Sequence, residues 1–346
     1  MASKTKLIKN VIINSLIFVY FSVVGFSLFN YRSHCVFTSP STLLRLPHLD
    51  KSDRGRCRVD LDKLELAKLD IFTAPEFDFI LEKNQHVKKG GVSKPVGCSA
   101  WQKVAIIVPY RDRLHHLKIL LHRLHAMLVK QLIEYRIFVI EQSGLDKFNR
   151  GKLMNIGYLE ALKFGDFDCF VFHDADLLPE NDQNLYMCDQ HARHLSSAID
   201  EMRYHVMYYN YAGGVIAINR ENYQRINGYS NFYWGWGNED DDLSARIQES
   251  GLLITRPPEP IGRFKMVRHA KLSRAEHGNE LFFGWRGRWP EDGLNDGVGM
   301  NYTVLHFTEE PLFTNITVNI GSRPKTMPNH STTQESLFWF LKFYYP

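Results

Sequence analysis

The sequence predicts an α/β fold with a mainly parallel, Rossmann-like central sheet. Short apolar runs of strand length alternate with longer segments whose apolar residues recur at helical spacing. Such an alternation implies right-handed crossovers between parallel strands. Ligands of open parallel sheets bind at the carboxyl ends of the strands, so we expect the functional residues there.

Three segments have the continuous apolar character of strands buried on both faces, and they are Lys103–Arg113 (KVAIIVPYRDR), Tyr135–Ile140 and Cys169–His173. We expect Pro109 to end the first of these runs. Between the strands, helices are predicted over His116–Lys130 and Lys152–Phe164.

The N-terminal residues predict a membrane anchor. Val11–Phe29 is a run of 19 residues without a charge, and three lysines precede it. About 20 apolar residues cross a bilayer core, and basic residues favour the cytosolic side. The alternative is a cleaved signal peptide, whose apolar core is normally about 7–15 residues and ends at a small-residue site. We therefore expect a cytosolic tail (1–10), a transmembrane signal anchor (11–29), a stem (30–56) and a lumenal domain (57–346).

Composition agrees with a large globular domain. Apolar residues make up 44% of the 346-residue chain and aromatic residues 13%, which supports a substantial core. The net charge of +4 is spread along the sequence. A nucleic-acid-binding protein would instead concentrate basic residues on one face, so we expect no nucleic acid partner.

Sequons and cysteines fit a lumenal domain. Sequons begin at Asn301, Asn315 and Asn329. The five cysteines include no metal-type CxxC pair, and they are Cys35, Cys57, Cys98, Cys169 and Cys188. In an oxidising lumen four of them could form two disulfides and leave one over. Cys35, just past the apolar run, is the natural unpaired one, available for palmitoylation or an interchain bond, or simply inert.

Polar clusters follow the predicted strands. Arg111 and Arg113 follow the first strand, and Phe148-Asn149-Arg150 opens the helix after the second. Guanidinium groups suit a diphosphate because they are permanently charged and donate in a fork. The alternative is that they are surface charges at a strand exit.

Asp174 and Asp176 follow the third strand. Alternation in an extended segment would put both carboxylates on the same side. Mg²⁺ or Mn²⁺ held by few carboxylates and by substrate phosphates is usual in nucleotide diphosphate chemistry. The alternative is a pair of turn-forming or helix-capping aspartates.

Met266 and His269 lie three residues apart in MVRH. A site of Asp, Met and His would suit Mn²⁺ better than Ca²⁺ or Mg²⁺. In isolation, however, the methionine reads as core filler and the histidine as an ordinary surface or core residue.

The stretch FYWGWGNEDDD (232–242) sets aromatic residues and glycines against four consecutive acids. Adjacent acids raise one another's pKa, which makes one of them a better general base for an attacking alcohol. Tryptophans offer flat faces to sugar C–H groups. A helix is expected from Asp242 onward, so the alternative is an acidic helix start, where anions are favoured.

The motifs together resemble one family. PYRDR, FNRGKLMNIGYLEAL, FHDADLLP, YYNYAGGVIAI, YWGWGNEDDDL, GRFKMVRH, DGLN and TNITVNIG occur in the order seen in the metazoan β-1,4-galactosyltransferases. The resemblance covers about residues 98–321. It implies a Golgi single-pass type II enzyme with a GT-A type nucleotide-diphospho-sugar transferase fold. Such an enzyme inverts the anomeric carbon, uses Mn²⁺ and transfers galactose from UDP-galactose to O4 of a terminal N-acetylglucosamine.

The resemblance also implies residue roles. Asp176, Met266 and His269 would bind the metal, and Asp240 would be the catalytic base. The UDP contacts would be Arg111, Arg113, Phe148, Arg150 and Asp174. Acceptor and donor sugars would be bound by Glu239, Asp241 and Trp236, with Asp242 capping the helix. The disulfides would be Cys57–Cys98 and Cys169–Cys188. A lid from Val267 to about Glu291 would close over the donor, with Asp292–Asn295 at its end.

Donor choice rests on Tyr211, which stands where the family's tyrosine crowds a 2-acetamido group, so the donor is expected to be UDP-galactose. Three departures bear on specificity. Ala212 replaces a bulkier aromatic residue, and Asn238 replaces the usual glycine. The lid is shorter than usual, and four of its aromatic residues replace those that usually cup the N-acetyl group: Phe282, Phe283, Trp285 and Trp289.

Three alternatives stay open at this point. The donor could be UDP-N-acetylgalactosamine. The acceptor could be xylose or glucosylceramide. From a different functional class, the chain could be a sugar-binding adhesion or scaffold protein that has kept the fold and lost turnover.

Overall fold

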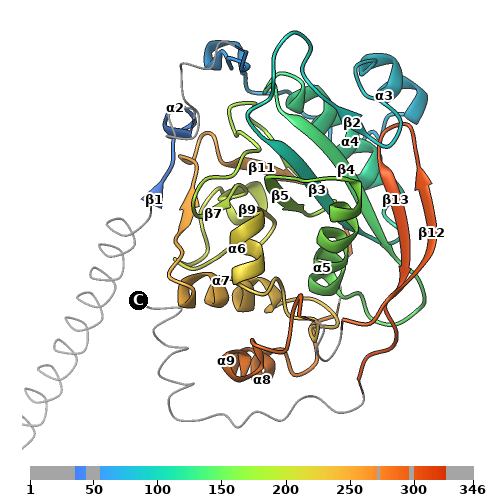
Figure 1. The fold of residues 1–346 in the computed structure, drawn as a ribbon, viewed down its shortest axis with the longest axis vertical. Coiled ribbons are helices and arrows are strands. Elements are labelled where there is room, and N and C mark those ends of the chain that lie inside the picture. Colours follow the sequence, from blue (N-terminus) through green and yellow to red (C-terminus); the bar gives the residue numbers. More distant parts are fainter. Residues whose placement is uncertain (1–35, 44–54, 271–272, 296–299, 325–346) are drawn as a thin grey trace, which may run out of the picture.

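The computed structural model describes residues 36–43, 55–270, 273–295 and 300–324 (Figure 1). Over these residues a ten-stranded sheet forms the centre of the molecule. Its strand order is β1 (Val36–Phe37), β10 (Ile254–Arg256), β7 (Ala192–His194), β9 (Val215–Asn219), β5 (Cys169–His173), β3 (Lys103–Tyr110), β4 (Glu134–Gln142), β13 (Thr314–Asn319) and β12 (Thr303–Glu309), with β2 (Val92–Ser93) also on β4.

The middle of this sheet is parallel, as predicted. β3 pairs in parallel with both β4 and β5, and β13 pairs in parallel with β4. β9 is antiparallel to both of its neighbours, and β12 to β13, so the whole sheet is mixed. The expectation that Pro109 ends the first strand is wrong, because β3 continues to Tyr110 with Pro109 opposite Ile140. Pairing with β5 stops at Ile107, so a residue without an N–H is tolerated beyond it.

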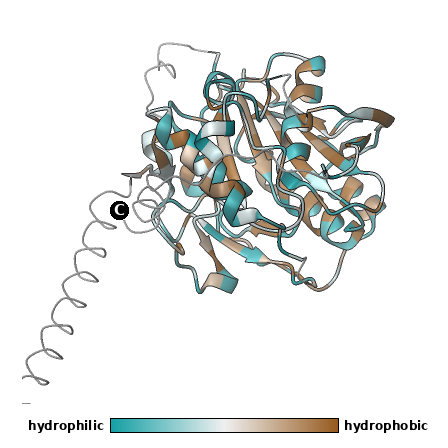
Figure 2. Cartoon of the chain, turned by 90° about the horizontal axis from the view of Figure 1, so that it is seen from below, coloured by the Kyte–Doolittle hydropathy of each residue, from teal (hydrophilic) through white to brown (hydrophobic). Residues whose placement is uncertain are grey.

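Two helices cover opposite faces of the sheet. α4 (Leu114–Leu128) packs against the alternate β3 residues Val104, Ile106 and Val108. α5 (Arg150–Ala161) packs against Ala105 and Ile107 on the other face. Both faces of β3 are therefore buried, which is the physical reason for its uninterrupted apolar sequence. Figure 2 shows the apolar residues concentrated along these inner elements.

Both helix predictions are confirmed, with shifted ends. α5 begins at Arg150 because the Asn149 side chain accepts a hydrogen bond from the Lys152 amide at 2.9 Å, which makes Asn149 the N-cap. The last residues of the predicted helix, Leu162–Phe164, form a 3₁₀ turn.

A smaller three-stranded sheet lies beside the large one and consists of β6 (Leu177–Pro179), β11 (Arg263–Met266) and β8 (Ala198–Ile199). The remaining α-helices in the described part of the chain are α2 (Pro40–Leu43), α3 (Phe77–Lys83), α6 (Arg220–Arg225), α7 (Glu239–Glu249), α8 (Gly278–Phe283) and α9 (Trp285–Arg288), and further 3₁₀ turns are at Leu61–Lys63 and Asp200–Met202. α7 runs below the sheet in Figure 1, with α8 and α9 beyond it.

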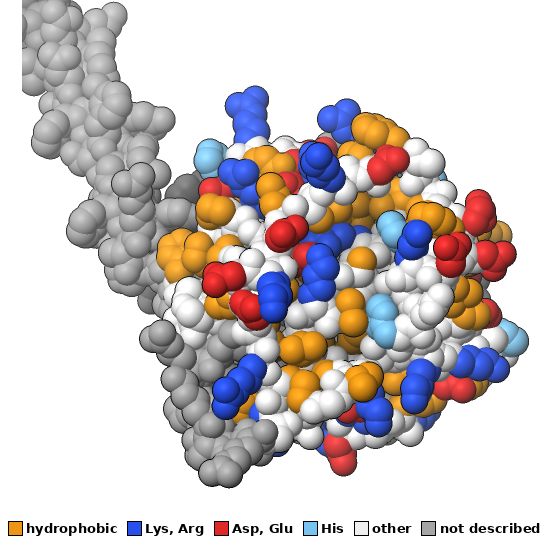
Figure 3. Space-filling model, turned by 90° about the horizontal axis from the view of Figure 1, so that it is seen from above, with side chains coloured by type: hydrophobic (Ala, Val, Ile, Leu, Met, Phe, Trp, Pro, Cys, Tyr) orange, Lys and Arg blue, Asp and Glu red, His pale blue; other side chains and the backbone are white. Residues whose placement is uncertain are grey.

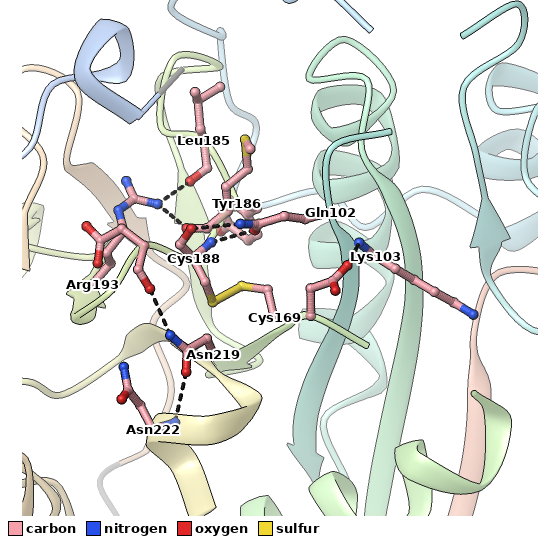
Figure 4. Close-up of a disulfide and its surroundings, with 12 residues drawn as sticks. Gln102, Lys103, Cys169, Leu185, Tyr186, Cys188, Arg193, Asn219 and Asn222 are labelled. Atoms are coloured by element: carbon pink, nitrogen blue, oxygen red, sulfur yellow. Dashed lines mark hydrogen bonds between the residues drawn. A yellow bond between two sulfur atoms is a disulfide. The ribbon is translucent and has the colours of Figure 1, made fainter. Parts of the chain in front are cut away.

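Both disulfides implied by the resemblance are present, Cys57–Cys98 and Cys169–Cys188. Figure 4 shows the second, which ties β5 to the loop before β7. The side chain of Gln102 bonds both the N–H and the C=O of Cys188, at 2.8 Å each, so the same loop is also held to the start of β3. Cys35 lies outside the described residues.

Part of the predicted stem packs on the domain. β1 pairs in parallel with β10, and Leu43 at the end of α2 is 1% exposed in the core. The prediction that residues 30–56 form a stem did not include this contact with the domain. The predicted tail and anchor (1–29) lie outside the described residues, and within the described ranges no helix has the length and apolar character to cross a bilayer.

The surface carries charges of both signs. In Figure 3, acidic and basic side chains are interspersed on the face seen from above, without one concentrated basic patch.

Candidate active site

The predicted site residues gather where the first turns of α5 and α7 meet the end of β5 and the smaller sheet. Arg150 is at the centre. Its Nε donates to Asp174 Oδ1 at 2.5 Å, its Nη1 lies 3.4 Å from Glu239 Oε1, and its Nη2 donates to the carbonyl of Gly214 at 3.1 Å. One guanidinium thus connects three segments separated by up to 89 positions in the sequence.

The two aspartates after β5 do not share one side as an extended segment would require. Residues 175 and 176 form a turn between β5 and β6. Asp174 faces Arg150, whereas Asp176 Oδ2 lies 2.7 Å from His269 Nε2. Buried His173 stabilises this turn, because its Nδ1 forms a hydrogen bond with the Asp174 carbonyl at 2.8 Å. Burial lowers the pKa of His173 to about 4, so this imidazole is neutral.

Asp176, Met266 and His269 come together as predicted. β11 runs antiparallel to β6 with Met266 opposite Leu177, and the Val267 amide donates to the Asp176 carbonyl at 2.8 Å. Contact with the Asp176 carboxylate raises the pKa of His269. Arg113 Nη2 lies 3.0 Å from His269 Nδ1.

These residues fit a borderline divalent ion. Asp176 and His269 bring a carboxylate oxygen and an imidazole nitrogen to within 2.7 Å of each other, and the backbone of Met266 lies beside them, opposite Leu177. Among the described residues, no three His, Cys, Asp or Glu side chains form a group that could hold a metal.

Glu239, Asp240 and Asp241 occupy the first turn of α7, which begins three residues before the expected start at Asp242. Burial, followed by the charge of Asp240, raises the pKa of Glu239 to about 8, and Glu239 Oε2 has no partner among the described residues. Burial also raises the pKa of Asp240. Asp241 accepts a short hydrogen bond from the Tyr208 hydroxyl. The three acids therefore have three different environments.

Asp240 lies against the YAGG segment. A Cβ added at Gly213 would collide with Asp240 Oδ2 and would stand 2.7 Å from the hydroxyl of Tyr211. The missing side chain thus lets the carboxylate and the phenol approach each other. The Tyr211 ring packs edge-on against the rings of Tyr208 and His194, with ring-centre distances of 5.5 and 5.4 Å. Ala212 behind it is buried in the core.

Asn238 and Trp236 lie just before the acids. Asn238 has φ +73°, a left-handed conformation that asparagine tolerates better than other side chains with a Cβ. The family's usual glycine and this chain's asparagine therefore meet the same backbone requirement. The Trp236 side chain is 59% exposed, and the guanidinium of Arg274 stands 5.6 Å from its ring centre.

Arg111 and Phe148 are adjacent on the other side of the site. The Arg111 guanidinium is 5.4 Å from the Phe148 ring centre and donates to the Asp146 carbonyl at 2.7 Å. The Phe148 carbonyl accepts from the Gly235 amide at 2.8 Å, which joins the start of α5 to the WGWG stretch.

The prediction that Asp242 caps α7 is wrong. The N-cap position is Asn238, and Asp242 is 0% exposed inside the protein. Asp242 pairs with Arg246 at 2.6 Å and with Arg288 at 3.0 Å, and it accepts from the Tyr233 hydroxyl at 2.9 Å. Its partners lie up to 46 positions away, so the acidic run alone could not distinguish it from its neighbours.

Sequence reasoning missed several residues that support the site. They are Tyr208, His173, Gly213 and Arg288. Only Gly213 left a readable signal, because two consecutive glycines often mark a close approach of the backbone to another group. The others have unremarkable sequence contexts.

Three of the aromatic residues in the predicted lid pack near α7. Phe282 and Trp285 pack on Ala245 of α7, and Trp289 stands 5.7 Å from Trp285. This packing fixes α8 and α9 against the helix that carries the acids.

The chain matches two protein-family models. Residues 61–189 match the N-terminal region of glycosyl transferase group 7, and residues 193–270 match a model described as the N-terminal domain of galactosyltransferase. β-1,4-Galactosyltransferase 3 of Cricetulus griseus is 44% identical over 259 residues, which are 72% of this chain and 64% of that protein. β-1,4-Galactosyltransferase 2 of Homo sapiens is 42% identical over 260 residues, 74% of this chain and 70% of that protein. The match thus spans less than two thirds of the type 3 relative.

Solved structures agree. The catalytic domain of Drosophila β-1,4-galactosyltransferase 7 in complex with xylobiose is 30% identical, with a TM-score of 0.53, and the match covers 63% of this chain and 93% of that one. A mutant of the same enzyme, complexed with manganese, UDP-Gal and xylobiose, also has a TM-score of 0.53, at 28% identity. The predicted GT-A type fold is confirmed.

Proposed function

This chain belongs to the β-1,4-galactosyltransferase family of glycosyl transferase group 7, and we propose that it transfers galactose from UDP-galactose to O4 of a terminal N-acetylglucosamine on glycoprotein or glycolipid glycans, inverting the anomeric carbon. The observation that carries the proposal is the convergence of Asp240, Arg150 and the Asp176–His269 pair on one site.

Asp240 is the proposed general base. It lies in the first turn of α7, and the side-chain-free backbone of Gly213 leaves room beside its carboxylate. The acceptor O4 attacks C1 of galactose while its proton passes to a carboxylate oxygen of Asp240. The bond from C1 to the diphosphate oxygen breaks on the opposite face, and UDP leaves. This single displacement inverts the configuration at C1.

Neighbouring charges orient the reactants. Arg150 holds Asp174 and Glu239 in fixed positions, and with Arg111 and Arg113 it offers donors to a diphosphate. Glu239, whose pKa of about 8 keeps it largely protonated at neutral pH, can both donate to and accept from an acceptor sugar. Asp241 lies in the same first turn of α7 and accepts a hydrogen bond from the Tyr208 hydroxyl.

Asp176, Met266 and His269 would hold Mn²⁺, and UDP oxygens would complete its ligands. When bound, the ion would neutralise charge that develops on the leaving diphosphate. The manganese and UDP-Gal in the Drosophila mutant complex support this assignment.

Tyr211 supports galactose as the donor sugar. Its ring is fixed by Tyr208 and His194, and its hydroxyl lies beside Asp240, so it can crowd a 2-acetamido group. For the acceptor, the xylobiose bound to the Drosophila enzyme favours xylose as the second candidate. We place the protein in the Golgi membrane as a type II enzyme, on the apolar run 11–29 and on the family.

The experiment is a matrix of donors and acceptors with the full chain and Mn²⁺. UDP-galactose and UDP-N-acetylgalactosamine are each offered with N-acetylglucosamine, xylose and glucosylceramide acceptors. We expect transfer of galactose to N-acetylglucosamine. Preference for UDP-N-acetylgalactosamine would overturn the role of Tyr211, and no transfer from any pair would favour a sugar-binding protein without turnover.

A further inference from the structure

A buried ion-pair cluster joins α7 to the segment after α8, and it consists of Asp242, Arg246, Arg288 and Asp292. Asp242 pairs with Arg246 at 2.6 Å and with Arg288 at 3.0 Å. Asp292 Oδ2 lies 3.3 Å from Arg246 Nη2 and 3.4 Å from Arg288 Nε. Each side chain is therefore bonded to two others, in a closed ring of alternating charge.

The cluster is buried and balanced. Its four members are at most 3% exposed, and two carboxylates face two guanidinium groups. Removing one member of such a set leaves an uncompensated charge away from water, which is strongly destabilising.

Three segments that carry proposed site residues are bonded to this cluster. Asp242 directly follows Asp241 in the first turn of α7. The hydroxyl of Tyr233, from the FYWGWG stretch, donates to Asp242 at 2.9 Å. The carboxylate of Asp292 accepts from the Asn231 amide at 2.7 Å.

Asn231 also connects the cluster to the start of α5. Its carbonyl accepts a hydrogen bond, at 2.8 Å, from the side chain of Asn149, the N-cap residue directly before Arg150. The acids of α7, the aromatic stretch and the Arg150 turn are thus fixed to one charged core. Arg288 belongs to α9 and therefore lies outside these three segments.

We propose that Arg288 is a positioning residue for the transfer reaction, acting through Asp242 on the first turn of α7. This inference rests on the proposed function, because it concerns the placement of Asp240. Displacing a catalytic group by about 1 Å can cost about 100-fold in rate. A change at Arg288 should therefore reduce turnover in molecules that remain folded.

A merely structural role would have a different signature, and the chain offers a matched control. Arg123 of α4 forms a buried ion pair with Asp182 at 2.7 Å, with side chains 7% and 1% exposed. Its other bond, from Nε to the Pro179 carbonyl at 2.7 Å, goes to β6 and not to α7, so Arg123→Met should lower the Tm by a similar mechanism without displacing Asp240.

The experiment compares Arg288→Met, Arg288→Lys and Arg123→Met in the full chain. We measure kcat at saturating UDP-galactose and acceptor, well below the lowest Tm. We expect kcat to fall about 10- to 100-fold in Arg288→Met, to recover in part in Arg288→Lys, which keeps a cation beside Asp242, and to stay at the wild-type value in Arg123→Met. Wild-type kcat in folded Arg288→Met would overturn the proposal.

If Arg288→Met does not fold, Tyr233→Phe tests the proposal instead, because this variant removes only one hydroxyl bonded to Asp242. A severalfold lower kcat supports the proposal, and an unchanged kcat contradicts it. If the wild type transfers no sugar, the proposed function fails separately. The amide hydrogen exchange of residues 239–242 then becomes the readout, with faster exchange expected in the Arg288 variant but not in the Arg123 variant.

Discussion

Two groups of acids in the first turn of α7 behave in opposite ways. Glu239 and Asp240 share the positive charge of one guanidinium, Arg150, which also pairs with Asp174. Asp242 has two guanidinium partners and a tyrosine hydroxyl. The first group is short of positive charge, and the second is balanced.

The difference bears on the roles proposed for these carboxylates. Where positive charge is scarce, burial raises the pKa of Glu239 to about 8, so Glu239 can exchange a proton near neutral pH, and burial also raises the pKa of Asp240. Where charge is balanced, Asp242 is fixed in the core and affects turnover only through the position of α7. Variants of the two groups should therefore differ in stability.

The largest effect is expected for Asp240→Asn, which removes the proposed base. Transfer should fall at least 100- to 10,000-fold, the range of general-base contributions, while UDP binding persists. Initial rates and equilibrium UDP binding measure the two quantities. Asp166→Asn, at a 96% exposed side chain paired with Arg220, is the surface control. Loss of UDP binding in Asp240→Asn would mean that its role is misassigned.

Asp242→Asn should lower stability, and it should also lower turnover, because the proposed effect of Arg288 on Asp240 acts through Asp242. Two buried guanidinium groups lose their shared carboxylate, and breaking a buried pair typically costs about 3–5 kcal/mol. Urea unfolding measures the loss, and Asp240→Asn should show no comparable loss. Equal stabilities for the two variants would abolish the distinction between the two groups.

His269→Ala tests the other half of the site. The Mn²⁺ concentration for half-maximal transfer should rise at least about tenfold, because one proposed ligand is removed. Direct Mn²⁺ binding, followed by the electron paramagnetic resonance of the free ion, gives a readout independent of turnover. His205→Ala, on an exposed loop, is the control. An unchanged metal titration would remove His269 from the ligand set.

The smallest effect concerns pH and Glu239. Its folded pKa of about 8 exceeds the ordinary value of 4.5, so its protonated form favours the folded state. This contribution is fully present below about pH 4.5 and is lost as pH rises through about 8. Asp240, Arg150 and Asp174 face Glu239. Glu239→Gln should therefore flatten the decline of Tm between pH 5 and 8, and a wild-type slope in that variant would contradict the assigned pKa.

The sequence by itself determined the central elements. The apolar runs of β3, β4 and β5 and the helical spacing of α4 and α5 are local patterns, and they reflect burial on two faces of a sheet and on one face of a helix. The family motifs also predicted that Asp176, Met266, His269 and the acids of α7 belong to one site. Both disulfide pairings followed from the resemblance.

Only the tertiary structure decided what each acid does. Asp174 and Asp176 differ because a turn separates their side chains, and Asp242 differs from Asp240 because Arg288 reaches it from 46 positions away. The packing of residues 36–43 on β10 also depends on distant segments. Periodicity reports which residues are buried, but the sign and number of charges around a buried carboxylate depend on long-range contacts. Those contacts separate the acids with proposed roles in transfer from Asp242, which lies in the buried ion-pair cluster.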